Sequence, residues 1–222
     1  MNDADRQDYV RRYENRLNEF GYSPETLGWG RHGRQRIRFA VLAELALQMP
    51  ASSVLDVGCG FADLHDFLTE RGWRGNYTGI DIVPRLLAEA RRRHPHLDLK
   101  EADITNPANS LPVCDFVIAS GIFNATLATG DNEAHIQTAL QSMFRLARVA
   151  VAVDFLSSHV DFQKSESWHT DPAQALTLAK KISRRFRLRH DYMPYEFALF
   201  LFADDSISEQ NVFQAFENSL SK

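Results

Sequence analysis

Two acidic residues and two glycines are spaced as in a site that binds a nucleoside. Asp56 lies inside the apolar run "SVLDVG" and precedes Gly58 and Gly60, while Asp81 follows 21 residues after Gly60. Glycines between a strand and a helix let the backbone approach a ligand and direct the helix N-terminal amides at it. An acidic residue about 20 residues further on is a common acceptor for ribose hydroxyls. The spacing therefore predicts a ribose-binding site.

Asp56 indicates which nucleoside would suit this site. A carboxylate beside the glycine loop repels an anionic pyrophosphate but attracts a cationic amine. A ribose, a cationic amine and no phosphate together describe S-adenosylmethionine. Cys59 lies between the two glycines and could be a nucleophile. We disfavour this role because no residue that could act as its base is near it in the sequence.

The elements that must position these residues alternate between helix and strand patterns. This alternation predicts an α/β fold with a mostly parallel sheet. Only "MP" separates the last two strand patterns, so we expect them to form an antiparallel hairpin. Strand patterns cover 53–58, 77–81, 97–103, 115–120, 149–155, 186–192 and 195–202, and helical patterns cover 5–20, 33–49, 61–71, 84–93, 131–147 and 171–182.

Length and composition narrow the class of protein. A chain of 222 residues suits a single domain, which we divide into an N-terminal helical cap (1–50), a cofactor-binding core (51–155), and a lid loop, helix and hairpin (156–222). No apolar run is long enough to span a membrane, and the polar N-terminus does not resemble a secretory signal. We expect a cytoplasmic protein whose two cysteines are reduced. The net charge of −4 disfavours a nucleic-acid partner.

Four segments resemble, in order and spacing, the successive motifs of the class I S-adenosylmethionine-dependent methyltransferases. They are "VLDVGCGFADL", "YTGIDIVPRLLAEAR", "EADI" and "CDFVIASGIFN". The resemblance covers residues 53–155, and "LGWGRHGRQRIRF" and "HDYMPYEF" are similar to a bacterial subgroup of that superfamily. It implies a Rossmann-like, doubly wound sheet of seven strands, ending in an antiparallel C-terminal hairpin strand. It also implies S-adenosylmethionine as cofactor.

Residue by residue, the resemblance implies roles along the first two strands. Asp56, Gly58 and Gly60 would surround the methionine part of the cofactor. Asp81 would accept both ribose hydroxyls, and Ile82 would lie against the adenine.

The next two strands supply the remaining cofactor contacts that the resemblance implies. Asp103 would accept the adenine amino group, although it could instead cap a turn. Ile104 would offer its backbone amide to the ring, and Ser120 would lie beside the sulfonium or the amino-acid moiety. Ala62 departs from the pattern, because many members have a third glycine there. We also consider Arg38 as a partner for the cofactor carboxylate.

The acceptor side carries no comparable motif. Methyl transfer requires positioning of the nucleophile, and it requires a base only for a hydroxyl or a protonated amine. The fourth-strand exit lacks the Asn/Asp-Pro-Pro-aromatic tetrapeptide of enzymes that methylate planar amino groups. Asn124, His190 and Tyr195 are the catalytic candidates, and the aromatic loop 156–170 is a candidate lid.

The function that we predict is methyl transfer from S-adenosylmethionine to a small molecule, with no metal ion. The acceptor atom and the oligomeric state stay open. One alternative is an enzyme that cleaves or cyclises S-adenosylmethionine without transferring its methyl group. Others are a nicotinamide-dependent oxidoreductase, disfavoured by Asp56, and a non-catalytic relative of the fold.

Overall fold

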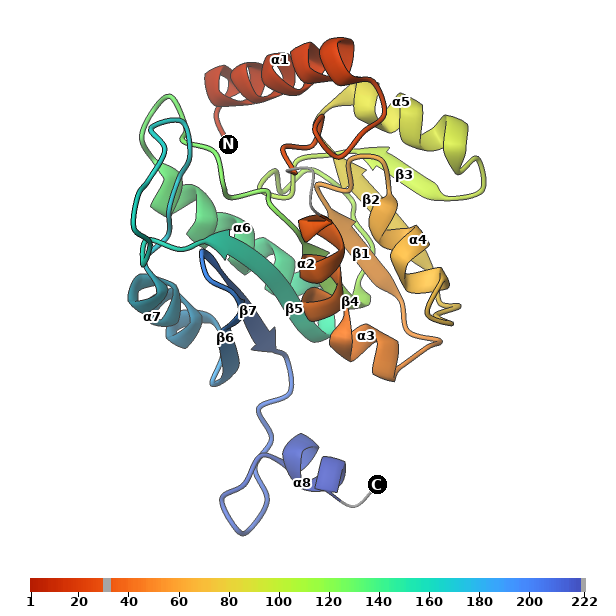
Figure 1. Ribbon diagram of the computed structural model, residues 1–222. Helices are drawn as coiled ribbons and strands as arrows, with labels where there is room; N and C mark the ends of the chain where they lie inside the picture. The colour runs from red at the N-terminus through yellow and green to blue at the C-terminus, as the bar shows by residue number, and fades with distance from the viewer. Residues whose placement is uncertain (30–32, 221–222) are drawn as a thin grey trace.

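A seven-stranded sheet forms the centre of the protein (Figure 1). The computed structural model describes residues 1–29 and 33–220. The strand order is β3-β2-β1-β4-β5-β7-β6. The first five strands pair in parallel, and β7 runs antiparallel to both β5 and β6, so the predicted fold class is confirmed. The strands are β1 (Val54–Val57), β2 (Tyr77–Asp81), β3 (Asp98–Glu101), β4 (Cys114–Ala119), β5 (Ala147–Leu156), β6 (Arg185–Met193) and β7 (Glu196–Phe202).

Helices cover both faces of this sheet. Helices α2 to α5 pack with one buried cluster, and α6 and α7 pack with the other. α1 lies beside α5 (Figure 1), whereas α8 projects away from the sheet. The helices are α1 (Asp3–Phe20), α2 (Arg34–Leu42), α3 (Glu44–Gln48), α4 (Asp63–Thr69), α5 (Pro84–Arg93), α6 (Asn132–Leu146), α7 (Pro172–Ile182) and α8 (Gln214–Leu220).

The central strands explain where a ligand can bind. All residues of β1 and β2 are buried, as in a parallel sheet that helices cover on both faces. The chain leaves β1 toward β2 on one side, whereas β4 pairs with β1 on the other. The order of strands therefore reverses beside β1. Open α/β sheets bind ligands at the carboxyl ends of the strands next to such a reversal.

Two features differ from the sequence expectation. The pattern over 33–49 predicted one helix, but the structure has α2 and α3, with a break at Ala43. Ala43 keeps right-handed helical dihedral angles (φ −88°, ψ 0°), and its carbonyl accepts the backbone N–H of Leu47 at 2.9 Å, so α3 follows α2 directly. The α8 helix was not predicted. Residues 30–32 of the glycine-bearing turn lie outside the described residues.

Within the described ranges 1–29 and 33–220, no helix is both long enough and apolar enough to cross a membrane. Both cysteines, Cys59 and Cys114, are buried and free.

Candidate cofactor pocket

One pocket gathers most of the predicted cofactor residues at the carboxyl ends of the central strands. Eight of the nine line it: Asp56, Gly58, Gly60, Asp81, Ile82, Asp103, Ile104 and Ser120. They come from the exits of β1, β2, β3 and β4. Further walls come from the N-terminal segment and α6, and include Met1, Tyr9, Tyr13, Leu27, Trp29, Gln35, Phe39 and His135.

The glycine loop lines the pocket with its backbone. Side chains would not fit at its glycine positions. Gly58 has φ 73°, and a Cβ there would lie 2.3 Å from Cγ2 of Ile122. Gly60 also has positive φ, at 54°, a region that glycine occupies without strain. The backbone N–H groups of Gly58 and Cys59 both donate to the carbonyl of Ile80, at 2.8 and 2.9 Å. The loop is therefore fixed to β2.

Asp81 is held rigidly where β2 ends. One carboxylate oxygen accepts the backbone N–H of Gly60 and the other accepts that of Val83, each at 2.9 Å. Burial raises the pKa of Asp81, and these backbone donors act in the opposite direction. A carboxylate has about four lone-pair positions, so Asp81 retains capacity for two further donors from the pocket.

Asp56 is the second buried carboxylate of the pocket. It accepts a hydrogen bond of 2.5 Å from the hydroxyl of Tyr77. Burial raises the pKa of Asp56 to about 7; the Tyr77 hydroxyl lowers it, and the charge of Asp81 raises it further. A cationic group in the pocket would favour the ionised form of Asp56.

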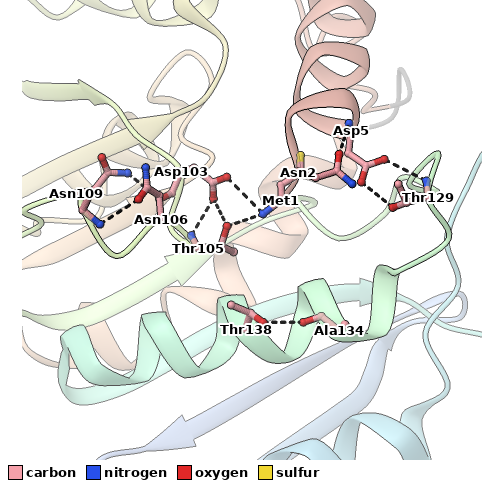
Figure 2. A network of polar contacts seen from close by, with 11 residues as sticks. Met1, Asn2, Asp5, Asp103, Thr105, Asn106, Asn109, Thr129, Ala134 and Thr138 are labelled. Carbon is pink, nitrogen blue, oxygen red and sulfur yellow. Dashed lines mark hydrogen bonds and ion pairs between the residues drawn. The ribbon is translucent and has the colours of Figure 1, made fainter.

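Asp103 lines the pocket and also caps a turn (Figure 2). Its Oδ1 accepts from the backbone N–H and the hydroxyl of Thr105, at 2.8 and 2.7 Å. Its Oδ2 lies 3.6 Å from the amine of Met1, and Asn109 donates to its carbonyl at 2.8 Å. Asp103 therefore caps this turn at the edge of the pocket, and its contact with the adenine amino group stays a prediction.

Ser120 is positioned by Asp154 of β5. The Ser120 hydroxyl donates to one carboxylate oxygen of Asp154 at 2.7 Å, and the backbone N–H of Gly121 donates to the other at 2.6 Å. Burial raises the pKa of Asp154 to about 6, while the nearby Arg38 lowers it. Asp154 therefore fixes the backbone that follows β4.

The structure does not bring Arg38 to the pocket. Its guanidinium forms a buried, bidentate ion pair with Glu196 of β7. The same group lies 4.3 Å from the ring centre of Trp29, and Trp29 forms the pocket wall instead. Nε and Nη2 of Arg38 are thus engaged by Glu196, whereas its Nη1 has no hydrogen-bond partner among the described residues. Because Arg38 does not line the pocket, we do not retain it as a cofactor ligand.

The three catalytic candidates also lie outside the pocket lining. The side-chain oxygen of Asn124 accepts the backbone N–H of Leu156 at 3.0 Å. Nε2 of His190 lies 2.8 Å from the hydroxyl of Ser157. Tyr195 is partly exposed on the hairpin. The side chains of Asn124 and His190 thus contact the chain at the β5 exit, whereas the Tyr195 ring lies 6.5 Å from that of Phe162.

The loop 156–170 contributes no residue to the pocket lining. Isolated bridges connect Ser167 of the loop to Ala125, and Ser157 to Thr170. A lid role for the loop stays a prediction.

Several lining residues were missed in the sequence. Tyr9 and Tyr13 of α1 face the pocket, and the hydroxyl of Tyr9 donates to the carbonyl of Ile122 at 3.0 Å. Their i,i+4 spacing was a signal that they share one helix face. His135 of α6 also lines the pocket, and burial lowers its pKa.

Burial raises the pKa of the Cys59 thiol well above its ordinary value, which argues against Cys59 as a thiolate nucleophile.

Comparisons with known proteins agree with this architecture. Residues 54–149 match the family described as a methyltransferase domain. A Mycobacterium tuberculosis protein named as a methyltransferase, Rv1506c, is 34% identical over 152 residues, which are 66% of this chain and 90% of that protein. The trans-aconitate 2-methyltransferase of Methylobacterium nodulans is 35% identical over 89 residues, 40% of this chain and 34% of that enzyme.

Solved structures share the fold at low sequence identity. Magnesium protoporphyrin IX methyltransferase from Synechocystis, crystallised with bound SAM, superposes with a TM-score of 0.62 at 16% identity, covering 91% of this chain and 99% of that chain. A TehB-like SAM-dependent methyltransferase from Corynebacterium glutamicum has a TM-score of 0.55 at 17% identity, with 90% and 98% covered. The family match, the relative from Mycobacterium and the strand order together show that the chain belongs to the class I S-adenosylmethionine-dependent methyltransferases.

Proposed function

We propose that this protein transfers the methyl group of S-adenosylmethionine to a small-molecule acceptor. The observation that carries the proposal is the position of Asp81, a buried carboxylate fixed by Gly60 and Val83 that still faces the pocket. A nucleoside ribose supplies two vicinal hydroxyl donors, which match the remaining lone pairs of this carboxylate.

The other pocket residues suit the remaining parts of the same cofactor. Asp56, with Gly58 and Gly60, would hold the amino-acid end of the cofactor, which carries a cationic amine. A buried carboxylate has lost its hydration, and a nearby cation compensates by stabilising its charged form. Ile82 would lie against the adenine, Ile104 would offer its backbone amide to the ring, and Asp103 would accept a hydrogen bond from the adenine amino group. Trp29 and Gln35 line the pocket and replace Arg38 as candidates for contact with the amino-acid end.

Methyl transfer makes limited demands on the protein. The sulfonium carbon is already activated, so the enzyme mainly aligns the acceptor with the methyl group and excludes water. Tyr9, Tyr13 and Trp29 would exclude water, because their side chains cover the pocket from the N-terminal segment. His135 is the imidazole among the described lining residues, and it is a candidate base if the acceptor is a hydroxyl.

The acceptor is proposed as a small molecule on the basis of shape and charge. Apolar and aromatic side chains surround the pocket on its N-terminal side, and such lining is typical of small-molecule sites. The net charge of −4 offers no general attraction for a polyanion. We propose that the whole chain forms a single methyltransferase domain.

Isotope-labelled S-adenosylmethionine distinguishes this function from its alternatives. The purified protein is incubated with the cofactor and an acceptor library, and products are separated by chromatography. Acceptor-dependent S-adenosylhomocysteine supports methyl transfer, whereas methylthioadenosine would indicate cleavage or cyclisation. Binding of NAD in place of S-adenosylmethionine would contradict the proposal.

A further inference from the structure

Three chemically active side chains meet between α4 and the C-terminal end of α5, outside the lining of the cofactor pocket. His65 and Asp66 are neighbours in α4, and His94 caps the C-terminus of α5. Nδ1 of His65 lies 3.4 Å from one carboxylate oxygen of Asp66, and Nε2 of His94 lies 3.5 Å from the other. None of the three lines the pocket, so the cluster is independent of the proposed cofactor site.

The spacing of these atoms suits a metal ion. One ligand atom from each residue can be chosen so that all three lie within 4.8 Å of one another. Zinc binds nitrogen and oxygen ligands at about 2.0–2.2 Å in a tetrahedron, which places neighbouring ligand atoms about 3.3–3.5 Å apart. The two imidazole nitrogens lie 3.4 and 3.5 Å from Asp66, His65 from Oδ1 and His94 from Oδ2. The carboxylate therefore lies between the two rings, and a small rotation of it would let one oxygen serve as the shared ligand.

A second observation comes from His94, whose side chain is only 10% exposed. Its Nε2 is buried and has no hydrogen-bond partner among the described residues. A buried polar atom without a partner costs about 1–3 kcal/mol, and ligation of a metal would remove that cost. The atom points toward Asp66, which is the position that a shared ion requires.

We propose that His65, Asp66 and His94 bind one Zn²⁺ ion. Two imidazoles and one carboxylate favour a borderline ion such as zinc over magnesium or calcium, which prefer all-oxygen sites. His96 adds a third imidazole beside the cluster, with ring centres 5.8 Å from His65 and 6.4 Å from His94.

The bound ion would join α4 to the C-terminal end of α5. The His65 ring also contacts the ring of Tyr77, 5.3 Å between centres, and Tyr77 donates to Asp56 in the pocket. The site would therefore stabilise the helix that follows the glycine loop without contributing a group to the pocket.

Metal titration of the full-length, untagged chain tests the site without cofactor or acceptor. Chelator-treated protein is titrated with ZnCl₂ in competition with a chromophoric chelator, and we expect one equivalent to bind. His94→Gln and Asp66→Asn should each weaken zinc affinity at least about 100-fold, because each removes a direct ligand. His159→Gln, which changes an exposed histidine of the 156–170 loop, should leave the affinity unchanged.

Thermal unfolding provides a second readout. Zinc at about 100 times its Kd should raise the Tm of the wild type by about 5–10 °C, and this shift should be absent in Asp66→Asn. Asp66 has a partly exposed side chain, so its variant remains informative if His94→Gln fails to fold. Absence of zinc binding to the wild type, or equal affinity in wild type and Asp66→Asn, would overturn the proposal.

Discussion

Buried polar side chains occur in both halves of the sheet, but their hydrogen-bond partners differ. Around β1 and β2, Asp56 and Asp81 line the pocket and retain capacity for ligand donors. Around β5 and β7, Arg38 and Glu196 form an ion pair with each other. Asp154 accepts hydrogen bonds from Ser120 and Gly121, which follow β4. A buried polar group that other protein groups engage away from the pocket serves the fold, whereas one that faces the pocket is available to a ligand.

The largest effect that this comparison predicts is on stability, from the Arg38–Glu196 pair. Arg38→Met leaves a buried carboxylate without its partner, which should lower the free energy of unfolding by about 3–5 kcal/mol. The affinity for S-adenosylmethionine should change by less than about threefold in the folded variant. Chemical denaturation and calorimetry measure the two quantities.

The double variant Arg38→Met/Glu196→Leu is the control for this pair. It removes both charges together, so most of the lost stability should return. If folded Arg38→Met instead lost cofactor affinity about 100-fold, Arg38 would belong with the cofactor residues, and the comparison would fail.

Next in size is the effect of Asp81→Ala on cofactor binding. The variant loses the acceptor of two ribose hydroxyls, and each hydrogen bond to a charged group contributes about 1.5–3 kcal/mol. We expect S-adenosylmethionine affinity to fall at least about 100-fold by calorimetry. Asp98→Ala, at a half-exposed aspartate on neighbouring β3, should bind normally; near-native affinity in Asp81→Ala would disprove the ribose assignment.

These two variants also show what could be predicted from sequence. The pocket residues lie in contiguous strand–loop–helix units, so the spacing of the glycines and acidic residues, together with the family resemblance, selected eight of nine residues that line one pocket. The prediction for Arg38 was wrong because its partner, Glu196, is 158 residues away in the sequence, so local spacing gives no sign of the ion pair. The His65–His94 cluster depends on helix packing in the same way, as does the position of α1 over the pocket.

A smaller effect should follow pH through Asp56. Because its pKa is raised to about 7, the carboxyl is mostly protonated at pH 6, and a cationic ligand must displace that proton. Affinity for S-adenosylmethionine should therefore rise about tenfold at most between pH 6 and 7.5, with proton release. Calorimetry in buffers of different ionisation enthalpy measures both, and Asp56→Asn should remove the dependence.

The smallest expected effect is that of Ala62→Gly, at the N-cap residue of α4, where the backbone has φ 64°. Ala62→Gly relieves about 1–2 kcal/mol of left-handed strain but loses a buried methyl group and increases unfolded-chain entropy. The stability should therefore change by less than about 1 kcal/mol. Ala62→Val should cost at least about 2 kcal/mol, because a branched side chain resists this conformation; equal stability of the two variants would contradict the observed backbone.

A crystal structure with S-adenosylhomocysteine tests the central claim most directly. Our account predicts that both ribose hydroxyls lie within hydrogen-bond distance of the Asp81 carboxylate, with the amino-acid end beside Asp56 and Gly58. Density for the nucleoside outside this pocket, or a ribose turned away from Asp81, would contradict it.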